Sequence, residues 1–272
     1  MKPVLAFLFI LIFSFTLFGQ DKRTMYFPKT EVPATQLPSK KNVWIFLLAG
    51  QSNMAGRGQV EPQDTVPDKR IMTINLKGQL ILAKEPLHLQ EPGNEGLDCG
   101  LSFARTMIKN LPPKISVLVI PTAIGGSSVS KWLGDSLYRN VHLLTNFREK
   151  MAIGKKYGVV KAVLWHQGEA DATPQKIPLY KNRLKELFTD FRTAAGNASL
   201  PVLLGELGPF KYNLEGFLKI NAVMKDYAVT DNYSAVIPTG DLKDKGDSLH
   251  FNSESQRIMG QRFAEEYLRK FR

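Results

Sequence analysis

The stretch that decides the fold runs from Val43 to Gly58 and reads VWIFLLAGQSNMAGRG. It opens with six apolar residues, Val43 to Leu48, whose β-branched and aromatic side chains favour a fully buried strand over a helix. Small and polar residues follow directly, from Ala49 to Asn53. Open α/β sheets place their chemistry at the carboxyl ends of buried strands, so Ser52 is a candidate nucleophile. The alternative is that Ser52 only caps the helix that follows.

The first twenty residues, 1–20, are predicted to be a secretory signal peptide. Lys2 supplies a positive start, and Val4 to Phe18 is an uncharged apolar run, short for a membrane span. We therefore expect the protein to be secreted or periplasmic, with no stable membrane partner after signal cleavage. An uncleaved membrane anchor is the alternative. The cleavage site stays open, because Phe18-Gly19-Gln20 is a poor small-x-small sequence.

Composition favours a single domain held together by its core. Cys99 is the only cysteine, so no internal disulfide can form. The chain is long enough for one large domain at 42–272, preceded by an extended, proline-containing leader at 21–41. The net charge is +11, but no basic run or aromatic-interleaved stripe accompanies it, so we expect a solvated surface and no nucleic acid partner.

Beyond the first strand, helical and strand patterns alternate along the chain. Further strands are predicted at 115–120, 159–165, 201–207 and 235–238, with helices at 101–110, 138–156, 178–195, 214–228 and 253–271. Such alternation indicates parallel strands joined by right-handed crossovers. We therefore predict an α/β fold, a three-layer α/β/α sandwich around a doubly wound five-stranded parallel sheet. A small hairpin is expected at 71–82, on either side of Lys77-Gly78.

Polar and small residues follow four of these strands. Since the carboxyl ends of parallel strands share one edge of a sheet, these residues are expected to converge on one crevice. Acyl transfer needs a nucleophile, a base, an orienting acid and donors for the oxyanion. Asp247 and His250, three residues apart, can share one turn, with the carboxylate accepting from one ring nitrogen and the other nitrogen facing Ser52.

Donors for the oxyanion are predicted after two of the strands. Gly125 and Gly126 lack a Cβ, so a backbone N–H there can approach the developing oxyanion, and the amide of Gln167 is a second donor. The alternative for the glycine pair is a simple turn. Asn53 and Trp132 are candidates for substrate binding. Trp132 follows Ser130-Lys131 and is a candidate to stack on a sugar ring, with burial in the core as its alternative.

A metal site is not predicted. Zinc ligands are usually closely spaced His or Cys, and no two of the four histidines lie within ten residues of each other. His88, His142 and His166 fit structural roles better than catalytic ones. The Gly-x-Ser-x-Gly elbow of α/β-hydrolases is absent, because Ser52 stands in Gly50-Gln51-Ser52-Asn53-Met54. No cofactor is expected.

At this point the sequence resembles the SGNH hydrolase superfamily and, within it, the carbohydrate esterase family 6 and sialate O-acetylesterase-like domain. The resemblance spans Asn42 to Tyr267. The matching blocks are Gly50 to Met54, Gly125 to Ser127 with Trp132, Trp165 to Asp171, and Asp247 to His250, and Phe103 to Arg105 resembles the family's first conserved helix.

The resemblance implies a flavodoxin-like sheet, with Ser52 as nucleophile and His250 as base. It further implies an oxyanion hole from the Ser52 N–H, a glycine N–H in the Gly125-Gly126 pair, and a side-chain amide. Gln167 stands where the generic superfamily has Asn. Asp247 is the expected acid, and Glu169 is a supporting or alternative acid for the histidine.

The predicted function is hydrolysis of O-acetyl groups on a carbohydrate through an acetyl-enzyme intermediate. The absence of a long apolar lid favours a short acyl group. Acetylxylan, other acetylated polysaccharides and O-acetyl sialic acid all remain open as substrates. The alternatives are an esterase or thioesterase acting on another short acyl group, and a catalytically silent carbohydrate-binding protein.

Overall fold

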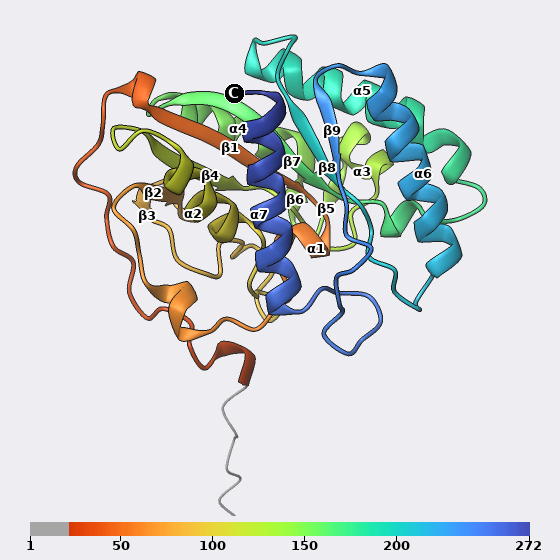
Figure 1. The fold of residues 1–272 in the computed structure, drawn as a ribbon, viewed down its shortest axis with the longest axis horizontal. Helices are drawn as coiled ribbons and strands as arrows, with labels where there is room; N and C mark the ends of the chain where they lie inside the picture. Colours follow the sequence, from red (N-terminus) through yellow and green to blue (C-terminus); the bar gives the residue numbers. More distant parts are fainter. Residues whose placement is uncertain (1–21) are drawn as a thin grey trace, which may run out of the picture.

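A seven-stranded sheet runs through the middle of the protein (Figure 1). The computed structural model describes residues 22–272, so the predicted signal peptide at 1–20 lies outside the described residues. The strand order is β3-β2-β4-β1-β7-β8-β9. The strands are β1 (Val43–Gly50), β2 (Ile71–Ile74), β3 (Leu80–Leu82), β4 (Ser116–Pro121), β7 (Val159–His166), β8 (Val202–Gly205) and β9 (Ser234–Ile237).

The α/β class with a mainly parallel sheet is confirmed, but the number of strands is not five. The predicted hairpin forms as β2 and β3, and it joins the sheet because β2 pairs in parallel with β4. β3 then lies antiparallel at the edge. Six strands are therefore parallel, with one antiparallel strand beside them.

β1 is the central strand, and its last residue fixes where the chain turns. It pairs in parallel with β4 on one side and β7 on the other, and all but one of its residues are buried. Gly50 has a φ of +139°, and a Cβ there would lie 2.1 Å from the carbonyl oxygen of His166. Only glycine allows β1 and β7 to approach so closely, just before Ser52.

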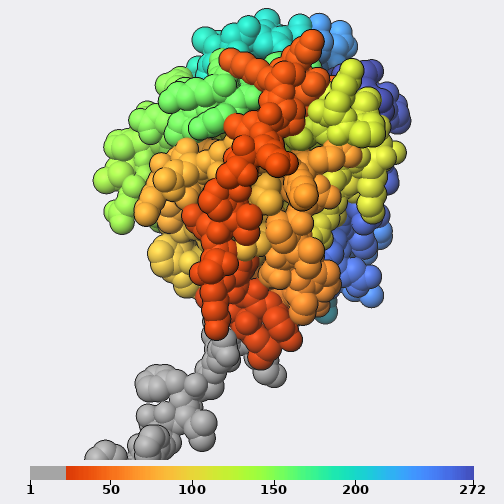
Figure 2. Space-filling model, turned by 90° about the vertical axis from the view of Figure 1, so that its left-hand side faces the viewer, coloured from red at the N-terminus to blue at the C-terminus, as the bar shows by residue number. Residues whose placement is uncertain are grey.

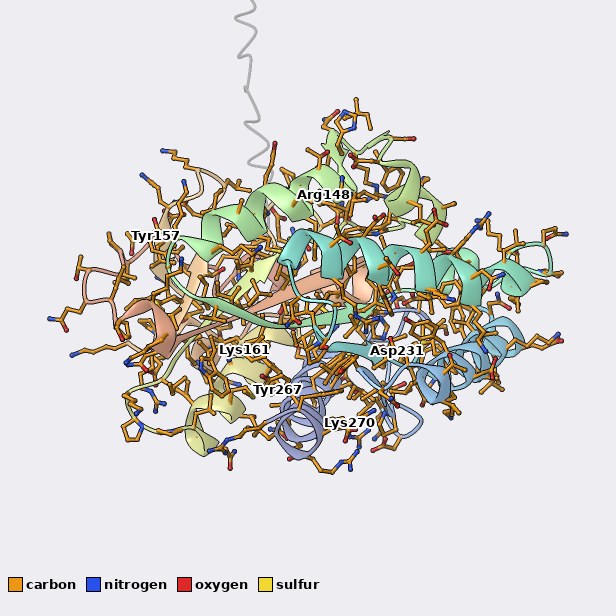
Figure 3. The ribbon with its side chains drawn as sticks, turned by 90° about the horizontal axis from the view of Figure 1, so that it is seen from above. Arg148, Tyr157, Lys161, Asp231, Tyr267 and Lys270 are labelled. Carbon is orange, nitrogen blue, oxygen red and sulfur yellow. The ribbon has the colours of Figure 1, made fainter. Side chains whose placement is uncertain are left out.

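Helices cover both faces of the sheet. On one side lie α2 (Gly100–Asn110) and α7 (Ser253–Lys270), which pack against each other. On the other lie α4 (Leu143–Lys155) and α5 (Ile177–Ala195), with α6 (Leu214–Thr230) packed against α5. Seen from above, Arg148 of α4 and Tyr267 of α7 lie on opposite sides of the sheet (Figure 3). The predicted three-layer arrangement is thus observed.

The segment predicted as one helix at 138–156 is divided instead. A short helix α3 (Val129–Gly134) precedes a hairpin of β5 (Leu137–Tyr138) and β6 (Val141–His142), and α4 begins only after it. Arg139 and Asn140 form the two-residue turn, with φ values of +48° and +61°. Positive φ at both central residues is the geometry of a tight hairpin, which ends any continuous helix here.

The described part of the leader covers the outer edge of the sheet. The backbone N–H of Leu82 donates to Val32 O at 2.8 Å, and the N–H of Ala34 donates to Leu80 O at 3.2 Å. We call residues 32–34 the edge strap. In Figure 2 the N-terminal segment, coloured red, runs along this face of the molecule. Short 3-10 turns occur at η1 (Lys22–Thr24), η2 (Lys40–Asn42), η3 (Pro62–Thr65) and η4 (Glu169–Asp171).

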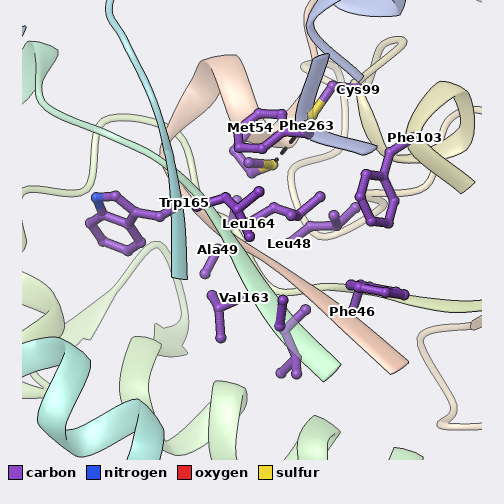
Figure 4. Packing of buried hydrophobic residues seen from close by; sticks show 14 of the residues in the cluster. Phe46, Leu48, Ala49, Met54, Cys99, Phe103, Val163, Leu164, Trp165 and Phe263 are labelled. Atoms are coloured by element: carbon purple, nitrogen blue, oxygen red, sulfur yellow. Dashed lines mark hydrogen bonds between the residues drawn. The ribbon is translucent and has the colours of Figure 1, made fainter. Parts of the chain in front are cut away.

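The core anchors the one-turn helix α1 (Ser52–Ala55) that follows β1. Met54 is fully buried, and the thiol of Cys99 donates to its Sδ at 3.7 Å (Figure 4). Burial raises the pKa of the Cys99 thiol well above its usual value. Phe46 packs edge-on against Phe103 on the same side of the sheet. No helix within residues 22–272 has the length and apolar character needed to cross a membrane.

Candidate active site

A cleft of about 320 Å³ lies at the carboxyl edge of the sheet. The predicted site residues that line it are Ser52, Gly125, Gly126, Glu169 and His250. They come from the ends of β1, β4 and β7 and from the loop after β9. Seven residues that the sequence did not single out also line it: Gln51, Arg57, Asn94, Arg139, Ala170, Tyr212 and Leu249.

Ser52, His250 and Asp247 form a continuous hydrogen-bonded chain. The Ser52 hydroxyl lies 3.1 Å from His250 Nε2, and His250 Nδ1 lies 2.7 Å from Asp247 Oδ2. A carboxylate can only accept, so Nδ1 carries the proton and Nε2 is free to accept from the hydroxyl. This is the geometry of a nucleophile, a base and an orienting acid.

The loop that carries His250 is held by the same carboxylate. Asp247 Oδ1 accepts from the backbone N–H groups of Leu249 at 3.0 Å and His250 at 2.8 Å. Burial by itself would raise the pKa of Asp247. The hydrogen bonds from the His250 backbone and ring and from Leu249 outweigh burial and lower this pKa to about 2. Asp247 is therefore ionised at neutral pH, as the orienting acid requires.

Asn53 does not contact substrate space, contrary to the expectation. Its side chain is buried, donates to Leu249 O at 3.1 Å and accepts from the Phe251 N–H at 3.1 Å. These two groups flank His250 in the chain. Asn53 therefore holds the loop that carries His250 in position.

Glu169 is not an alternative acid for the histidine. Its Oε1 accepts from the Asn53 amide at 2.6 Å, and the acid on the His250 ring is Asp247. Glu169 is joined to the loop that carries His250 through Asn53, whose amide also donates to Leu249 O. His166 beside it is structural, since its buried Nε2–H donates to Glu206 O at 2.9 Å. Burial lowers the pKa of the His166 imidazole.

Gln167 does not reach the cleft, contrary to the expected role as an oxyanion donor. It is fully buried, and its amide nitrogen donates to Gln51 Oε1 at 3.1 Å and to Asp171 Oδ2 at 2.7 Å. The hydroxyl of Tyr180 donates to the Gln167 carbonyl at 2.7 Å. Gln167 is thus a buried residue that supports the site, and Gln51 lies between Gln167 and the cleft.

The two glycines differ in what their N–H groups can do. The Gly125 N–H donates to Glu91 Oε2 at 2.7 Å, whereas the Gly126 N–H has no hydrogen-bond acceptor among residues 22–272. A Cβ on Gly125 would lie 2.4 Å from Arg57 Nη2, so the guanidinium packs directly against this glycine. Gly126 is therefore the candidate backbone donor from this pair.

Trp132 is a core residue rather than a sugar-stacking one. Its side chain is 0% exposed, its indole N–H donates to Ser127 Oγ at 3.0 Å, and its ring packs edge-on against Trp165 at 5.4 Å. The polar neighbours Ser130 and Lys131 suggested a loop, but the segment is the short helix α3, which turns the indole inward.

Charged and aromatic residues that the sequence did not reveal line the cleft. Arg57 and Arg139 both pair with the carboxylate of Glu91, at 3.1 Å in the case of Arg57. Burial would raise the pKa of Glu91, but the Gly125 N–H and the two arginines outweigh it and lower this pKa. Tyr212 is 68% exposed, with its ring stacked on Phe217. These residues lie in loops without a motif, except Arg57, which belongs to the stretch Val43 to Gly58 that decides the fold.

The arrangement offers a basic imidazole on a hydroxyl, with backbone and amide donors nearby, and so suits acyl transfer. Among residues 22–272, no three His, Cys, Asp or Glu side chains are placed to hold a metal ion.

The comparisons with known proteins agree with this chemistry. A family model described as carbohydrate esterase, sialic acid-specific acetylesterase, matches residues 42–269. The probable carbohydrate esterase At4g34215 of Arabidopsis thaliana is 28% identical over 263 residues, which cover 90% of this chain and 97% of the plant protein. These matches confirm the resemblance drawn from the four sequence blocks.

Two solved structures show the same fold. The X-ray structure of the Arabidopsis protein has a TM-score of 0.75 to this chain at 26% identity, over 85% of this chain and 100% of that one. A carbohydrate acetylesterase from Xanthomonas citri has a TM-score of 0.63 at 17% identity, over 84% of this chain and 56% of that one. At that identity the second likeness concerns the fold alone.

Proposed function

This chain belongs to the carbohydrate esterase, sialic acid-specific acetylesterase, family, and on that premise we propose that it removes O-acetyl groups from glycans. The single observation that carries the proposal is the Ser52–His250–Asp247 chain, with its 3.1 Å and 2.7 Å contacts at the wall of the cleft.

The proposed reaction has two steps. His250 Nε2 takes the proton of Ser52 Oγ, which attacks the acetyl carbonyl and forms a tetrahedral oxyanion. The imidazolium then returns that proton to the departing sugar oxygen, leaving an acetyl-enzyme. His250 next deprotonates a water molecule that attacks the acetyl carbon, and the proton returns to Ser52 as acetate leaves. Asp247 holds the imidazole in the required tautomer and stabilises its charged form.

For the substrate class, we propose an acetylated sugar that carries a carboxylate, such as O-acetyl sialic acid, over neutral acetylxylan. Arg57 and Arg139 bring two positive charges to the cleft, and Glu91 supplies one negative charge between them. The Arg139 side chain is 47% exposed and keeps donors free for a substrate. A guanidinium binds a carboxylate through paired, charge-assisted hydrogen bonds.

Acetate release tests the activity. Wild type and Ser52→Ala are incubated with O-acetylated sialic acid, acetylated xylan and a short-chain aryl acetate. Wild type is expected to release acetate, and Ser52→Ala is expected to lose ~10³-fold or more of kcat, as triad deletions do. Full activity of Ser52→Ala would remove Ser52 from the mechanism. No release from any substrate would favour another acyl group or a binding role.

A substitution in the turn between β5 and β6 tests the substrate class. Arg139→Gly suits the positive φ at this position, so the fold should be kept while the guanidinium is lost. We expect KM for O-acetyl sialic acid to rise about tenfold or more, the value of a charged hydrogen bond, with KM for acetylated xylan unchanged. Asn140→Gly, in the same turn, is the matched control. An equal effect on both glycans would contradict the proposal.

We also propose export through the predicted signal peptide at 1–20. N-terminal sequencing of the mature protein and cell fractionation test it. Leu11→Arg, which places a charge in the apolar run, should retain the protein in the cytoplasm. Wild type recovered in the cytoplasm with Met1 in place would contradict export.

A further inference from the structure

We propose that the side-chain amide of Gln51, and not that of Gln167, donates to the oxyanion formed on the acetyl carbonyl. The inference rests on the proposed esterase function and assigns a further catalytic residue within it. Its basis is the way in which two glutamines share one hydrogen-bond network behind Ser52.

Both N–H groups of the Gln167 amide are already committed. One donates to Gln51 Oε1 at 3.1 Å and the other to Asp171 Oδ2 at 2.7 Å. Asp171 Oδ2 also accepts from the Val129 N–H at 2.8 Å, which ties this carboxylate to α3. An amide nitrogen has two hydrogens, so Gln167 has none left for a substrate.

The orientation of the Gln51 amide is fixed by groups that can only donate to it. Its Oε1 accepts from the backbone N–H of Ala170 at 3.1 Å as well as from Gln167. The Nε2 group must therefore point away from both. No acceptor for Nε2 exists among residues 22–272, although the side chain is only 4% exposed. Gln51 Nε2 is not one of the buried polar atoms that lack a partner, so it keeps accessible surface. Because Gln51 lines the cleft, this unpaired donor is available to a ligand there.

Gln51 is also in the right place. It precedes Ser52 directly and lines the same cleft as Ser52, Gly126 and His250. With the backbone N–H groups of Ser52 and Gly126, its Nε2–H makes a set of three donors that are held in place before the substrate arrives. Donors fixed in advance stabilise the developing charge without reorganisation cost. Gln167 is then a positioning residue that holds Gln51.

Two substitutions at Gln51 distinguish a donor to the oxyanion from a residue that only supports its neighbours. Gln51→Glu keeps an oxygen for the N–H groups of Ala170 and Gln167 but removes the donor, and Gln51→Met removes both without adding a charge. For each, kcat with an aryl acetate should fall ~10²–10³-fold, the usual cost of one oxyanion donor, with KM within about threefold. Gln261→Glu, an exposed site on α7, is the matched control.

The second readout is the affinity for methylboronic acid, whose serine adduct carries an oxygen at the oxyanion position. A purely structural residue would not change this affinity in step with kcat/KM, whereas a donor should weaken the adduct by about the same factor. Melting temperatures measured alongside show whether each variant is folded.

The outcomes are distinct. A kcat for Gln51→Met within threefold of wild type, or unchanged boronate affinity despite a lower kcat, would overturn the inference. So would a Gln167→Leu variant that loses more activity than Gln51→Met, because that order identifies Gln167 as the direct donor. If Ser52→Ala kept full activity, the esterase mechanism itself would fail, whatever the Gln51 variants do.

Discussion

Two regions of the site differ in how they are held. The floor, which we define as Gln51, Asn53, Gln167 and Asp171, lies at and beneath the base of the cleft and is almost completely buried. Its rim, which we define as Arg139, Tyr212 and Asp247, is exposed by 35 to 68%. Hydrogen bonds of the floor join the ends of β1 and β7, more than a hundred residues apart in the chain. At the rim, the hydrogen bonds that Asp247 accepts from the backbone come from residues only two and three positions further along the chain.

The floor and the rim therefore contribute to the site in different ways. Floor residues belong to the same packed structure as the sheet, so their geometry and the stability of the fold cannot be separated. Rim residues sit on turns that change side chains at little cost to the fold. Substitutions in the floor should therefore lower stability and activity together, and those in the rim should lower activity or binding alone.

The largest effect expected is that of Asp247→Asn at the rim. Without a carboxylate on Nδ1, His250 loses its tautomer and its charge partner, and kcat should fall ~10²–10⁴-fold. The melting temperature should fall only slightly, because the amide oxygen can still accept from the backbone N–H groups of Leu249 and His250. Steady-state kinetics with an aryl acetate measure the effect, and Lys245→Gln, which removes the cation 3.3 Å from Asp247, is the control. A kcat within threefold of wild type would show that Asp247 is not needed for catalysis.

In the floor, Asn53→Leu should affect stability and rate together. The change leaves the Phe251 N–H and the Glu169 carboxylate without their partner, which should cost about 1–3 kcal/mol in the free energy of unfolding. With the histidine loop loosened, kcat should fall ~10–100-fold. Denaturant titration and kinetics test both. Asn232→Leu, at an exposed position outside the cleft lining, should change neither. A stable but inactive Asn53→Leu would break the distinction between floor and rim.

Tyr212→Ala should act on glycan binding alone. The exposed ring, stacked on Phe217, is placed as a platform for a sugar. If stacking contributes roughly 0.5–1.5 kcal/mol, KM for the glycan should rise about 2- to 12-fold, with kcat for an aryl acetate unchanged. Tyr212→Phe keeps the ring and should behave as wild type. A fall in melting temperature would instead place Tyr212 with the floor.

The smallest effect concerns pH. Because the folded-state pKa of Asp247 is about 2, below its ordinary 3.8, the ionised carboxylate stabilises the fold. That contribution is complete above about pH 5 and is lost as the pH falls toward 2. The difference in melting temperature between wild type and Asp247→Asn should therefore be larger at pH 6 than at pH 2.5. An equal difference at both values would show that the carboxylate charge has no part in it.

What could be predicted from the sequence differs from residue to residue and does not depend on whether a residue belongs to the floor or the rim. Ser52, Asp247 and His250 come together as expected, because strand ends share one edge and three-residue spacing suits one turn. Gln51 and Gln167 could not be told apart, since only the fold shows which amide stands in front. The sequence left Trp132 open between sugar stacking and the core, because polar neighbours in sequence say little about the direction of a side chain on a short helix. Arg139 and Tyr212 carry no motif at all.

The edge strap has a consequence for any shortened form of this protein. β3 is the last strand of the sheet on its side, and residues 32–34 occupy hydrogen-bonding groups along its outer edge. A chain trimmed to begin at β1 would present those groups to solvent, as a template for strands of neighbouring molecules. Such a chain keeps every residue of the cleft, yet it should self-associate and precipitate at concentrations at which the longer chain stays monodisperse.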